Sequence, residues 1–224
     1  MKRPRICVSI AAEDTERAVV AMHRADVFSP DLIEIRLDHM EPASGLERLR
    51  SATALPLIAT NRLVAEGGRF KGSEEERIGE LVRACEVGFD YVDLELTASD
   101  SIDEVRGRGA GLILSHHDLS GTPPIARLEG VLDAMLEFEP DICKIIGTAL
   151  TEDDNLTYLN LIRRARARAR IVSFGMGEVG LISRVLSPLF GGEYTYASVG
   201  EGEEAAPGQM PIESLRELYR LLGA

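Results

Sequence analysis

Residues 141–149, Asp-Ile-Cys-Lys-Ile-Ile-Gly-Thr-Ala, form a short apolar run that follows Glu139-Pro140 and contains one lysine, Lys144. Apolar runs of this length, bounded by turn residues, are typical of buried strands. Helical patterns flank the run at 123–138 and 152–168. The stretch therefore predicts a buried strand between two helices.

The same alternation of strand and helix patterns continues along the whole chain. Strand patterns lie at 5–10, 32–37, 57–59, 91–96, 111–115, 141–146, 171–174 and 194–199. Helix patterns lie at 14–25, 44–51, from a capping box at Ser73-Glu-Glu-Glu76 onward, and at 101–107, 123–138, 152–168, 178–186 and 211–222. Such alternation predicts a parallel sheet with helical crossovers. Eight units fit a closed (β/α)8 TIM barrel, an α/β fold forming a single domain over 1–224, and an open doubly wound sheet is the competing architecture.

Polar residues share one face of several predicted strands. Glu34 and Arg36 lie on one face of the second strand, and Asp93 and Glu95 on one face of the fourth, while apolar residues occupy the opposite faces. The outer face of a barrel packs on helices and must be apolar. The polar faces are therefore expected to point inward, near the strand ends where barrel enzymes have their active sites. The alternative for both pairs is an internal polar network that only shapes the barrel.

Lys144 is a candidate nucleophile by the same rule of alternating faces. An ammonium group in a buried strand costs several kcal/mol unless it is paired or neutralised. Desolvation lowers the pKa of a lysine, and a neutral amine can attack a carbonyl carbon. The alternative is a lysine whose amino group reaches solvent at a strand end. In the fifth strand, Ser115 and His117 share one face, whereas His116 lies on the other.

Composition excludes several classes of partner. The formal net charge of -12 argues against a nucleic acid or an anionic membrane surface. We see no signal peptide or transmembrane run, and no compact metal-ligand spacing. Three cysteines without paired spacing, Cys7, Cys85 and Cys143, are expected to be small buried residues. They favour a reducing, cytoplasmic location.

The polar residues at the strand ends form an informative series along the chain. It comprises Ser9, Glu34, Arg36, Asn61-Arg62, His117, Lys144, the segment 174–184 and the loop 203–209. Taken in this order, these residues resemble the type I 3-dehydroquinate dehydratases of the shikimate pathway. The resemblance extends from Ser9 to Gln209, and its motifs are Glu-Ile-Arg at 34–36, Arg62 with Glu66-Gly-Gly68, Ser-His-His-Asp at 115–118, Lys144-Ile145, Met176-Gly177 to Ser183-Arg184, and Ala-Pro-Gly-Gln at 206–209.

This resemblance implies a (β/α)8 barrel that dehydrates 3-dehydroquinate to 3-dehydroshikimate with no metal or organic cofactor. It implies that Lys144 forms a Schiff base with the substrate ketone. His117, with an expected pKa near neutrality, would move protons, and Glu66 would hold and polarise it. Arg184 would bind the substrate carboxylate. Other positions that would contact substrate hydroxyls or order the site are Ser9, Glu34, Arg36, Arg62 and Gln209, while His116 would be a bystander.

The sequence departs from the family pattern at Ala205, where a serine is frequent. This leaves open how the loop that contains Gly200, Gly202 and Gly208 closes as a lid over the site. Two rival functions remain: a class I aldolase acting on sugar phosphates, and a non-catalytic barrel that binds a small acid. An isologous homodimer is expected from the general preference of soluble proteins.

Overall fold

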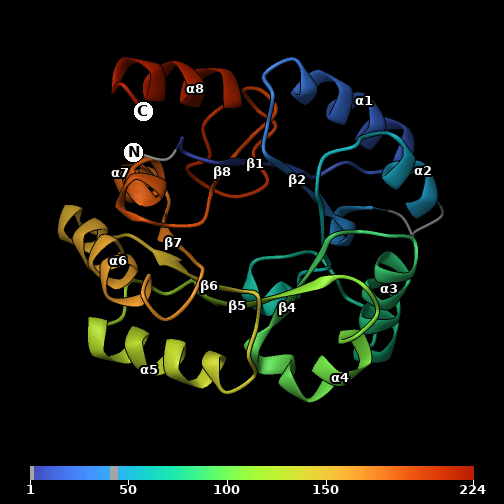
Figure 1. The fold of residues 1–224 in the computed structure, drawn as a ribbon, viewed down its shortest axis with the longest axis horizontal. Coiled ribbons are helices and arrows are strands. Elements are labelled where there is room, and N and C mark those ends of the chain that lie inside the picture. Colours follow the sequence, from blue (N-terminus) through green and yellow to red (C-terminus); the bar gives the residue numbers. More distant parts are fainter. Residues whose placement is uncertain (1–2, 41–44) are drawn as a thin grey trace.

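Parallel strands surround a common axis, and helices surround the strands, in the computed structural model of this protein (Figure 1), which describes residues 3–40 and 45–224. The strands are β1 (Ile6–Ile10), β2 (Leu32–Arg36), β3 (Leu57–Thr60), β4 (Tyr91–Glu95), β5 (Gly111–Asp118), β6 (Ile142–Thr148), β7 (Ile171–Met176) and β8 (Thr195–Ala197). The α-helices are α1 (Thr15–Asp26), α2 (Leu46–Ser51), α3 (Glu74–Glu86), α4 (Ile102–Val105), α5 (Ile125–Leu136), α6 (Glu152–Ala165), α7 (Leu181–Leu186) and α8 (Ile212–Leu221). Short 3-10 helices are η1 (Leu37–His39), η2 (Val64–Glu66), η3 (Leu96–Ser101) and η4 (Ser187–Phe190).

The strands follow one another around the sheet in chain order. The order is β7-β6-β5-β4-β3-β2-β1-β8, so β1 pairs with both β2 and β8. Within the described residues no strand ladder joins β7 to β8, but the N–H of Glu193 donates to the carbonyl of Ile171 at 2.7 Å across this seam. The prediction of a (β/α)8 barrel is confirmed. The doubly wound alternative is wrong, because its strand order would reverse direction within the sheet.

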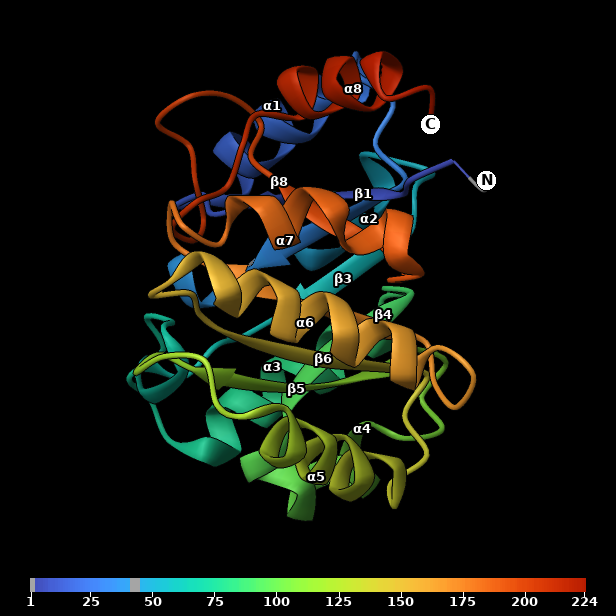
Figure 2. The same ribbon diagram turned by 90° about the vertical axis from the view of Figure 1, so that its left-hand side faces the viewer.

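The apolar core has two parts, one on each face of the sheet. The outer part lies between strands and helices and includes Val8, Ile33, Ala59, Leu94 and Ile145. Helices α5 to α8 cover one flank of this layer (Figure 2). The inner part fills the barrel near the strand starts with Cys7, Leu32, Ile58, Ile113, Ile142 and Val172. Since this layer closes the lower end of the barrel, polar inner residues further along each strand can form a site at the upper end.

Three aspartates brace the lower end of the barrel. Each directly precedes an even-numbered strand, and its carboxylate accepts a backbone N–H at the start of the preceding strand. The pairs are Asp31 with Ile6 at 2.9 Å, Asp90 with Leu57 at 2.9 Å, and Asp141 with Leu112 at 2.8 Å. These acids therefore satisfy N–H groups that strand pairing leaves free at that end.

Element bounds differ modestly from those predicted. The expected helix at 101–107 is reduced to α4, and most other helices begin later or end earlier than their patterns. Ser44, the predicted start of the second helix, lies outside the described residues, as do residues 1–2 of the predicted domain. The capping box of α3 is confirmed, with Ser73 N–H bound to Glu76 Oε2 at 2.8 Å and Glu76 N–H bound to Ser73 Oγ at 3.2 Å.

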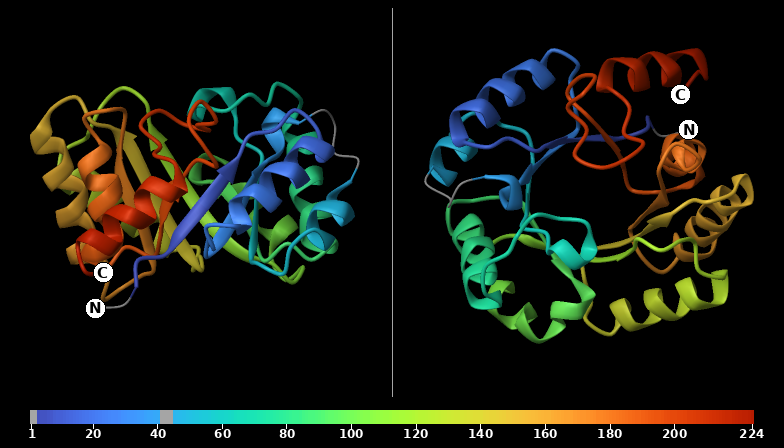
Figure 3. Two further views of the ribbon diagram at one scale, coloured as in Figure 1. Left: turned by 90° about the horizontal axis from the view of Figure 1, so that it is seen from above. Right: turned by 180° about the vertical axis from the view of Figure 1, so that it is seen from behind.

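The long loop after β8 lies at the opposite end of the barrel from the C-terminus of the chain (Figure 3). That end also carries the segment after β3 that contains η2. Among the helices of the described residues, none is both long and apolar enough to cross a membrane. The upper end of the barrel, covered by these two segments, is where a site can form.

Candidate active site

A cavity of about 330 Å³ occupies the upper end of the barrel. Its lining includes every residue that the sequence analysis proposed for the site: Ser9, Glu34, Arg36, Arg62, Glu66, His117, Lys144, Arg184 and Gln209. His116 does not line it, as alternation along β5 predicts. Residues far apart in the sequence thus converge, because each stands on the inner face of a strand or on a segment that follows its strand at the upper end of the barrel.

Lys144 lies in the middle of β6 and is only 6 % exposed. Its Nζ atom is 2.8 Å from Asp93 Oδ2 and 3.6 Å from Glu34 Oε1. The ring of Tyr196 lies beneath it, with its centroid 4.8 Å from Nζ. The alternative of a lysine that reaches solvent at a strand end is therefore wrong. Carboxylates and an aromatic face offset the cost of burying its ammonium group.

Arg62 connects Asp93 to the rest of the site. Its guanidinium lies 2.6 Å from Asp93 Oδ1, 3.0 Å from Glu95 Oε1 and 3.9 Å from Glu66 Oε2. The hydroxyl of Ser115 donates to Asp93 Oδ1 at 2.6 Å. Although burial alone would raise the pKa of Asp93, the charges of Arg62 and Lys144 outweigh it and hold that pKa well below its usual range. Asp93 is therefore a permanent anion beside the lysine.

His117 and Glu66 form the second charged group of the cavity. His117 Nδ1 lies 2.9 Å from Glu66 Oε2, and η2 carries Glu66 over the end of β5. Burial, together with the charges of Arg62 and Lys144, lowers the pKa of His117 well below its ordinary value. Burial also raises the pKa of Glu66 to about 7. The expectation of a histidine pKa near neutrality is thus wrong, and the ring is neutral near neutral pH and able to accept a proton.

Glu34 is held by hydroxyl groups from three strands. It accepts from Thr60 Oγ1 at 2.9 Å and from the Tyr196 hydroxyl at 3.1 Å, and Ser9 Oγ also donates to it. Burial alone would raise the pKa of Glu34, but the charges of Lys144 and Arg36 lower it. Ser9 thus lines the cavity and also holds the carboxylate of Glu34 in place.

Arg36 and Gln209 join the barrel to the loop after β8. Arg36 forms two parallel bonds to Asp38, at 2.8 and 2.7 Å, and donates to the carbonyl of Ala205 at 3.2 Å. The N–H of Ala205 donates to Gln209 Oε1 at 2.8 Å. Ala205 contributes its backbone to both contacts, so neither contact requires a side-chain hydroxyl at this position.

Arg184 is a buried cation of a different kind. It is 2 % exposed, its guanidinium stacks over Phe174 at 4.3 Å, and Nη2 donates to the carbonyl of Pro207 at 2.9 Å. Its Nε has no hydrogen-bond partner, and no carboxylate in residues 3–40 or 45–224 pairs with it. Burial accordingly lowers its pKa to about 9. This cation is suited to an anionic ligand.

Three residues around Lys144 were not predicted as its partners. Alternation along β4 predicts that Asp93 points inward but not that it reaches the lysine, and no motif indicates Tyr196 or Thr60. Alternation along β8 could have indicated Tyr196, because Tyr194 and Tyr196 flank the outward Thr195. Within the described residues there is no group of three or more histidine, cysteine, aspartate or glutamate side chains that could hold a metal ion.

Comparison with known proteins gives a consistent family. A model described as Type I 3-dehydroquinase matches residues 6–224. A 3-dehydroquinate dehydratase of Dehalococcoides mccartyi is 38% identical over 226 residues, covering 98% of this chain and 96% of that protein. One from Thermococcus onnurineus is 38% identical over 217 residues, covering 96% of each.

Solved structures agree with the sequence relatives. The 3-dehydroquinate dehydratase of Geobacillus kaustophilus has a TM-score of 0.90 at 27% identity, covering 99% of this chain and 92% of that one. The type I enzyme of Clostridium difficile, solved with covalently modified comenic acid, has a TM-score of 0.90 at 28% identity, covering 99% and 93%. An orotidine 5'-phosphate decarboxylase of Pyrococcus horikoshii, with a TM-score of 0.62 at 17% identity, covering 98% and 99%, shares the fold alone.

Proposed function

The chain belongs to the type I 3-dehydroquinase family, and we propose that it dehydrates 3-dehydroquinate to 3-dehydroshikimate through a Schiff base on Lys144. The observation that carries the proposal is the buried amine of Lys144, in one cavity with a histidine–carboxylate pair and with Arg184. Relatives named 3-dehydroquinate dehydratase support the reaction. A solved neighbour with a covalently modified acid supports covalent chemistry.

The first step joins enzyme and substrate. His117 takes a proton from the Lys144 ammonium, and the free amine attacks the ketone carbon. His117 returns the proton to the hydroxyl of the resulting carbinolamine, which leaves as water, so that a protonated imine forms and His117 is neutral again. Asp93, 2.8 Å from Nζ, and Glu34, 3.6 Å away, stabilise that positive charge.

The second step removes water from the substrate. Neutral His117 takes a proton from the carbon next to the imine, and the electron pair moves onto the imine nitrogen, giving an enamine. The electrons then return and expel the β-hydroxyl, which His117 protonates as it leaves. Water hydrolyses the remaining imine, which restores Lys144 and releases the conjugated ketone.

Glu66 supports this step by orienting the histidine. While Glu66 is ionised it accepts the Nδ1 proton of His117, so that Nε2 has a free lone pair. The polarised ring is also a better base, since the carboxylate stabilises the imidazolium that forms. The two residues therefore act as one proton-transfer unit.

Arg184 orients the substrate through its carboxylate. A guanidinium and a carboxylate can form two parallel hydrogen bonds, which fixes the substrate ring as well as its position. Substrate hydroxyls are left for Glu34, Arg36, Arg62 and Gln209 around the cavity. The loop with Gly200, Gly202 and Gly208 would move as a lid and exclude water during the reaction.

The two rival functions fit the site less well. An aldolase acting on a sugar phosphate would need free N–H groups for the phosphate after β7 and β8. Here the N–H of Gly177 donates to the Pro207 carbonyl at 3.2 Å, and that of Gly180 donates to the Gly177 carbonyl at 3.2 Å. A non-catalytic barrel would bury a lysine and a histidine at a cost without a purpose.

A direct assay tests the proposed reaction. Adding 3-dehydroquinate to the purified protein should produce near-ultraviolet absorbance, because the product has a carbon–carbon double bond conjugated to its ketone. Lys144→Ala should remove this activity, while Lys71→Ala, which changes an exposed lysine, should retain it. Absorbance that stays flat with the parent protein would refute the function.

We also propose that the protein works in the cytoplasm as an isologous homodimer. The free, buried state of Cys7, Cys85 and Cys143 supports a reducing compartment. The dimer rests on the general preference of soluble proteins for two-fold assemblies. A molar mass from light scattering equal to that of one protomer would refute the proposed dimer.

A further inference from the structure

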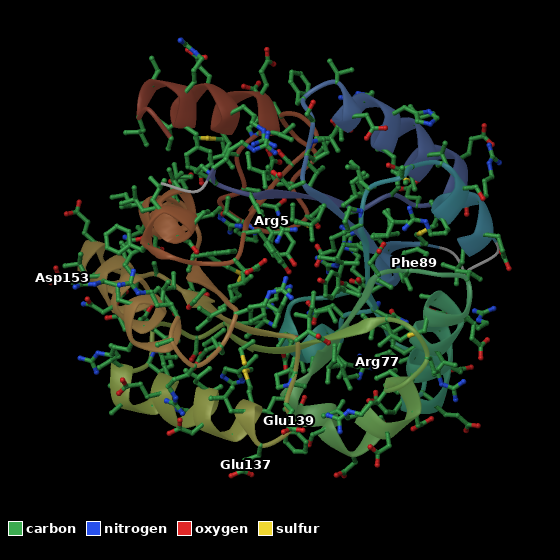
Figure 4. All side chains as sticks on the ribbon, in the orientation of Figure 1. Arg5, Arg77, Phe89, Glu137, Glu139 and Asp153 are labelled. Atoms are coloured by element: carbon green, nitrogen blue, oxygen red, sulfur yellow. The ribbon has the colours of Figure 1, made fainter. Side chains whose placement is uncertain are left out.

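A buried arginine outside the cavity is connected to the catalytic groups. Arg77 lies on α3, on the outer side of the barrel, yet it is 0 % exposed. Its Nη1 is 2.6 Å from Glu95 Oε2 on β4, and Glu95 is also fully buried. Figure 4 labels Arg77 in the helical layer outside the strands. Neither residue lines the cavity, so neither can touch a substrate there.

Glu95 connects Arg77 to the site through Arg62. Its other oxygen, Oε1, lies 3.0 Å from Arg62, which in turn lies 2.6 Å from Asp93. Asp93 ends the series at 2.8 Å from the amine of Lys144. Charges therefore alternate without a gap from the outer helix to the amine, and all of these contacts are closer than the Arg62–Glu66 distance of 3.9 Å.

Arg77 and Glu95 also hold the backbone on both sides of Arg62. Arg77 Nη1 donates to the carbonyl of Asn61 at 3.0 Å, and the N–H of Leu63 donates to Glu95 Oε1 at 3.3 Å. The 3-10 helix that carries Glu66 begins directly after Leu63. The pair thus fixes the backbone on both sides of Arg62 and the point where the chain leaves β3 toward η2.

We propose that Arg77 and Glu95 are positioning residues for the dehydration, which hold Arg62 between the Lys144–Asp93 pair and the His117–Glu66 pair and balance its charge. The inference rests on the proposed function. Without Arg77, Glu95 keeps Arg62 as its remaining buried partner and draws it away from Asp93 and Glu66. Without Glu95, the two arginines lose the anion that separates them.

The sign of the effect follows from the charges around the proton-transfer pair. Arg62, Lys144 and Arg36 face it as cations, and Asp93 and Glu95 as anions. Removing the positive charge of Arg77 leaves the charge of Glu95 balanced by Arg62 alone among the described residues, and this favours the protonated form of the pair. Removing Glu95 favours the unprotonated form. A purely structural role would lower activity at all pH values without moving the pH profile.

The test compares pH profiles of kcat/KM for charge variants of the buried pair. The acid limb is the part of the profile where kcat/KM falls at low pH. In Arg77→Gln this limb should lie at a pH higher by roughly 0.5 to 1.5 units, and in Glu95→Gln at a pH lower by a similar amount. The matched control is Arg83→Gln, on the same helix but 52% exposed, whose limb should coincide with that of the parent.

The double variant Arg77→Gln/Glu95→Gln separates charge balance from packing. Because it removes opposite charges together, its limb should return to within about 0.3 units of the parent. Arg77→Lys keeps the positive charge, so its acid limb should also lie near that of the parent. The double variant and Arg77→Lys provide the measurement if Arg77→Gln alone fails to fold. An acid limb that stays in place in Glu95→Gln and in any folded Arg77→Gln overturns the inference. A parent protein without dehydratase activity would instead refute the proposed function.

Discussion

Two buried cations face the same cavity with opposite surroundings. Lys144 contacts Asp93 and Glu34, whereas Arg184 has no carboxylate partner among the described residues. In the proposed reaction the lysine passes from ammonium to imine and is cationic in both states, so fixed anions beside it would stabilise both. In the same proposal the arginine attracts an anionic substrate from solution, and a resident carboxylate would compete with that substrate.

At the residue scale, the Glu66–His117 pair predicts the acid limb of the pH profile. Burial raises the pKa of Glu66 to about 7, while the pKa of His117 is lowered well below its usual value. As the pH falls through about 7, the pair gains a proton on Glu66, which then donates to Nδ1. His117 must carry its own proton on Nε2 and can no longer act as a base.

We therefore expect kcat/KM to fall about tenfold per pH unit below neutrality, with an apparent pKa that belongs to the pair. Glu66→Gln keeps a hydrogen-bond acceptor for Nδ1–H but cannot titrate. Its profile should lose this limb, although its maximum rate should also decrease. An unchanged limb in Glu66→Gln would assign the titration to another group.

The two adjacent histidines of β5 should differ sharply. His117→Ala removes the base and should slow turnover by about 100-fold or more, yet leave some imine formation. His116→Ala should change turnover little, because that ring lies on the outer face and does not line the cavity. Steady-state rates of both variants, with thermal melting as a control for folding, test this difference. Equal losses of rate in two folded variants would contradict the strand phase.

Arg184 should determine affinity through geometry as well as charge. Arg184→Lys retains a cation but loses the planar fork, so KM should rise about 10- to 100-fold, and Arg184→Ala should be worse. A substrate analogue without the carboxylate should bind the parent and both variants with similar, weak affinity. The cycle of enzyme variant against analogue measures the coupling. Penalties that simply add would mean that Arg184 and the carboxylate do not touch.

At the scale of elements, acids at the strand starts stabilise the barrel. Burial alone would raise the pKa of Asp31, but the N–H of Ile6 and the charges of Arg3 and Arg216 lower it. A carboxyl with a depressed folded-state pKa contributes stability above its unfolded pKa of about 3.9, and this contribution is lost as pH falls through the folded value.

Asp31→Ala should therefore lower the free energy of unfolding by about 1 to 3 kcal/mol at pH 7, with a smaller penalty below about pH 4. Asp133→Ala is the control: its carboxylate is 59% exposed and pairs with Arg168 at 2.6 Å. That variant should lose at most about 0.5 kcal/mol. Denaturant titrations at both pH values provide the measurement, and a pH-independent penalty for Asp31→Ala would contradict the electrostatic explanation.

At the scale of the whole molecule, the sequence predicted the barrel and the convergence of the site. Both follow from periodicity: alternation of units determines the architecture, and alternation along each strand places Lys144, His117 and Glu34 inside. What could not be predicted depends on distances across the barrel. Asp93 reaches Lys144 past the intervening strand β5, and only the curvature of the closed sheet brings them together.

Arg77 was unpredictable for a related reason. Its helix begins with a run of glutamates that is typical of a solvated surface, and nothing local distinguishes a buried arginine from an exposed one. The lowered pKa of His117 likewise depends on Arg62 and Lys144, which come from other strands. Sequence patterns determine which face a residue occupies, whereas its partners depend on the assembled fold.

The central claim is that Lys144 forms the covalent intermediate, and reductive trapping tests it most directly. The chain has three lysines, Lys2, Lys71 and Lys144, so an adduct can be assigned without ambiguity. Protein incubated with 3-dehydroquinate and borohydride should gain one adduct in its intact mass, located on Lys144 by peptide mapping. Lys71→Ala should give the same adduct and Lys144→Ala none. An adduct on Lys71, or dehydration that continues in Lys144→Ala, would contradict the account.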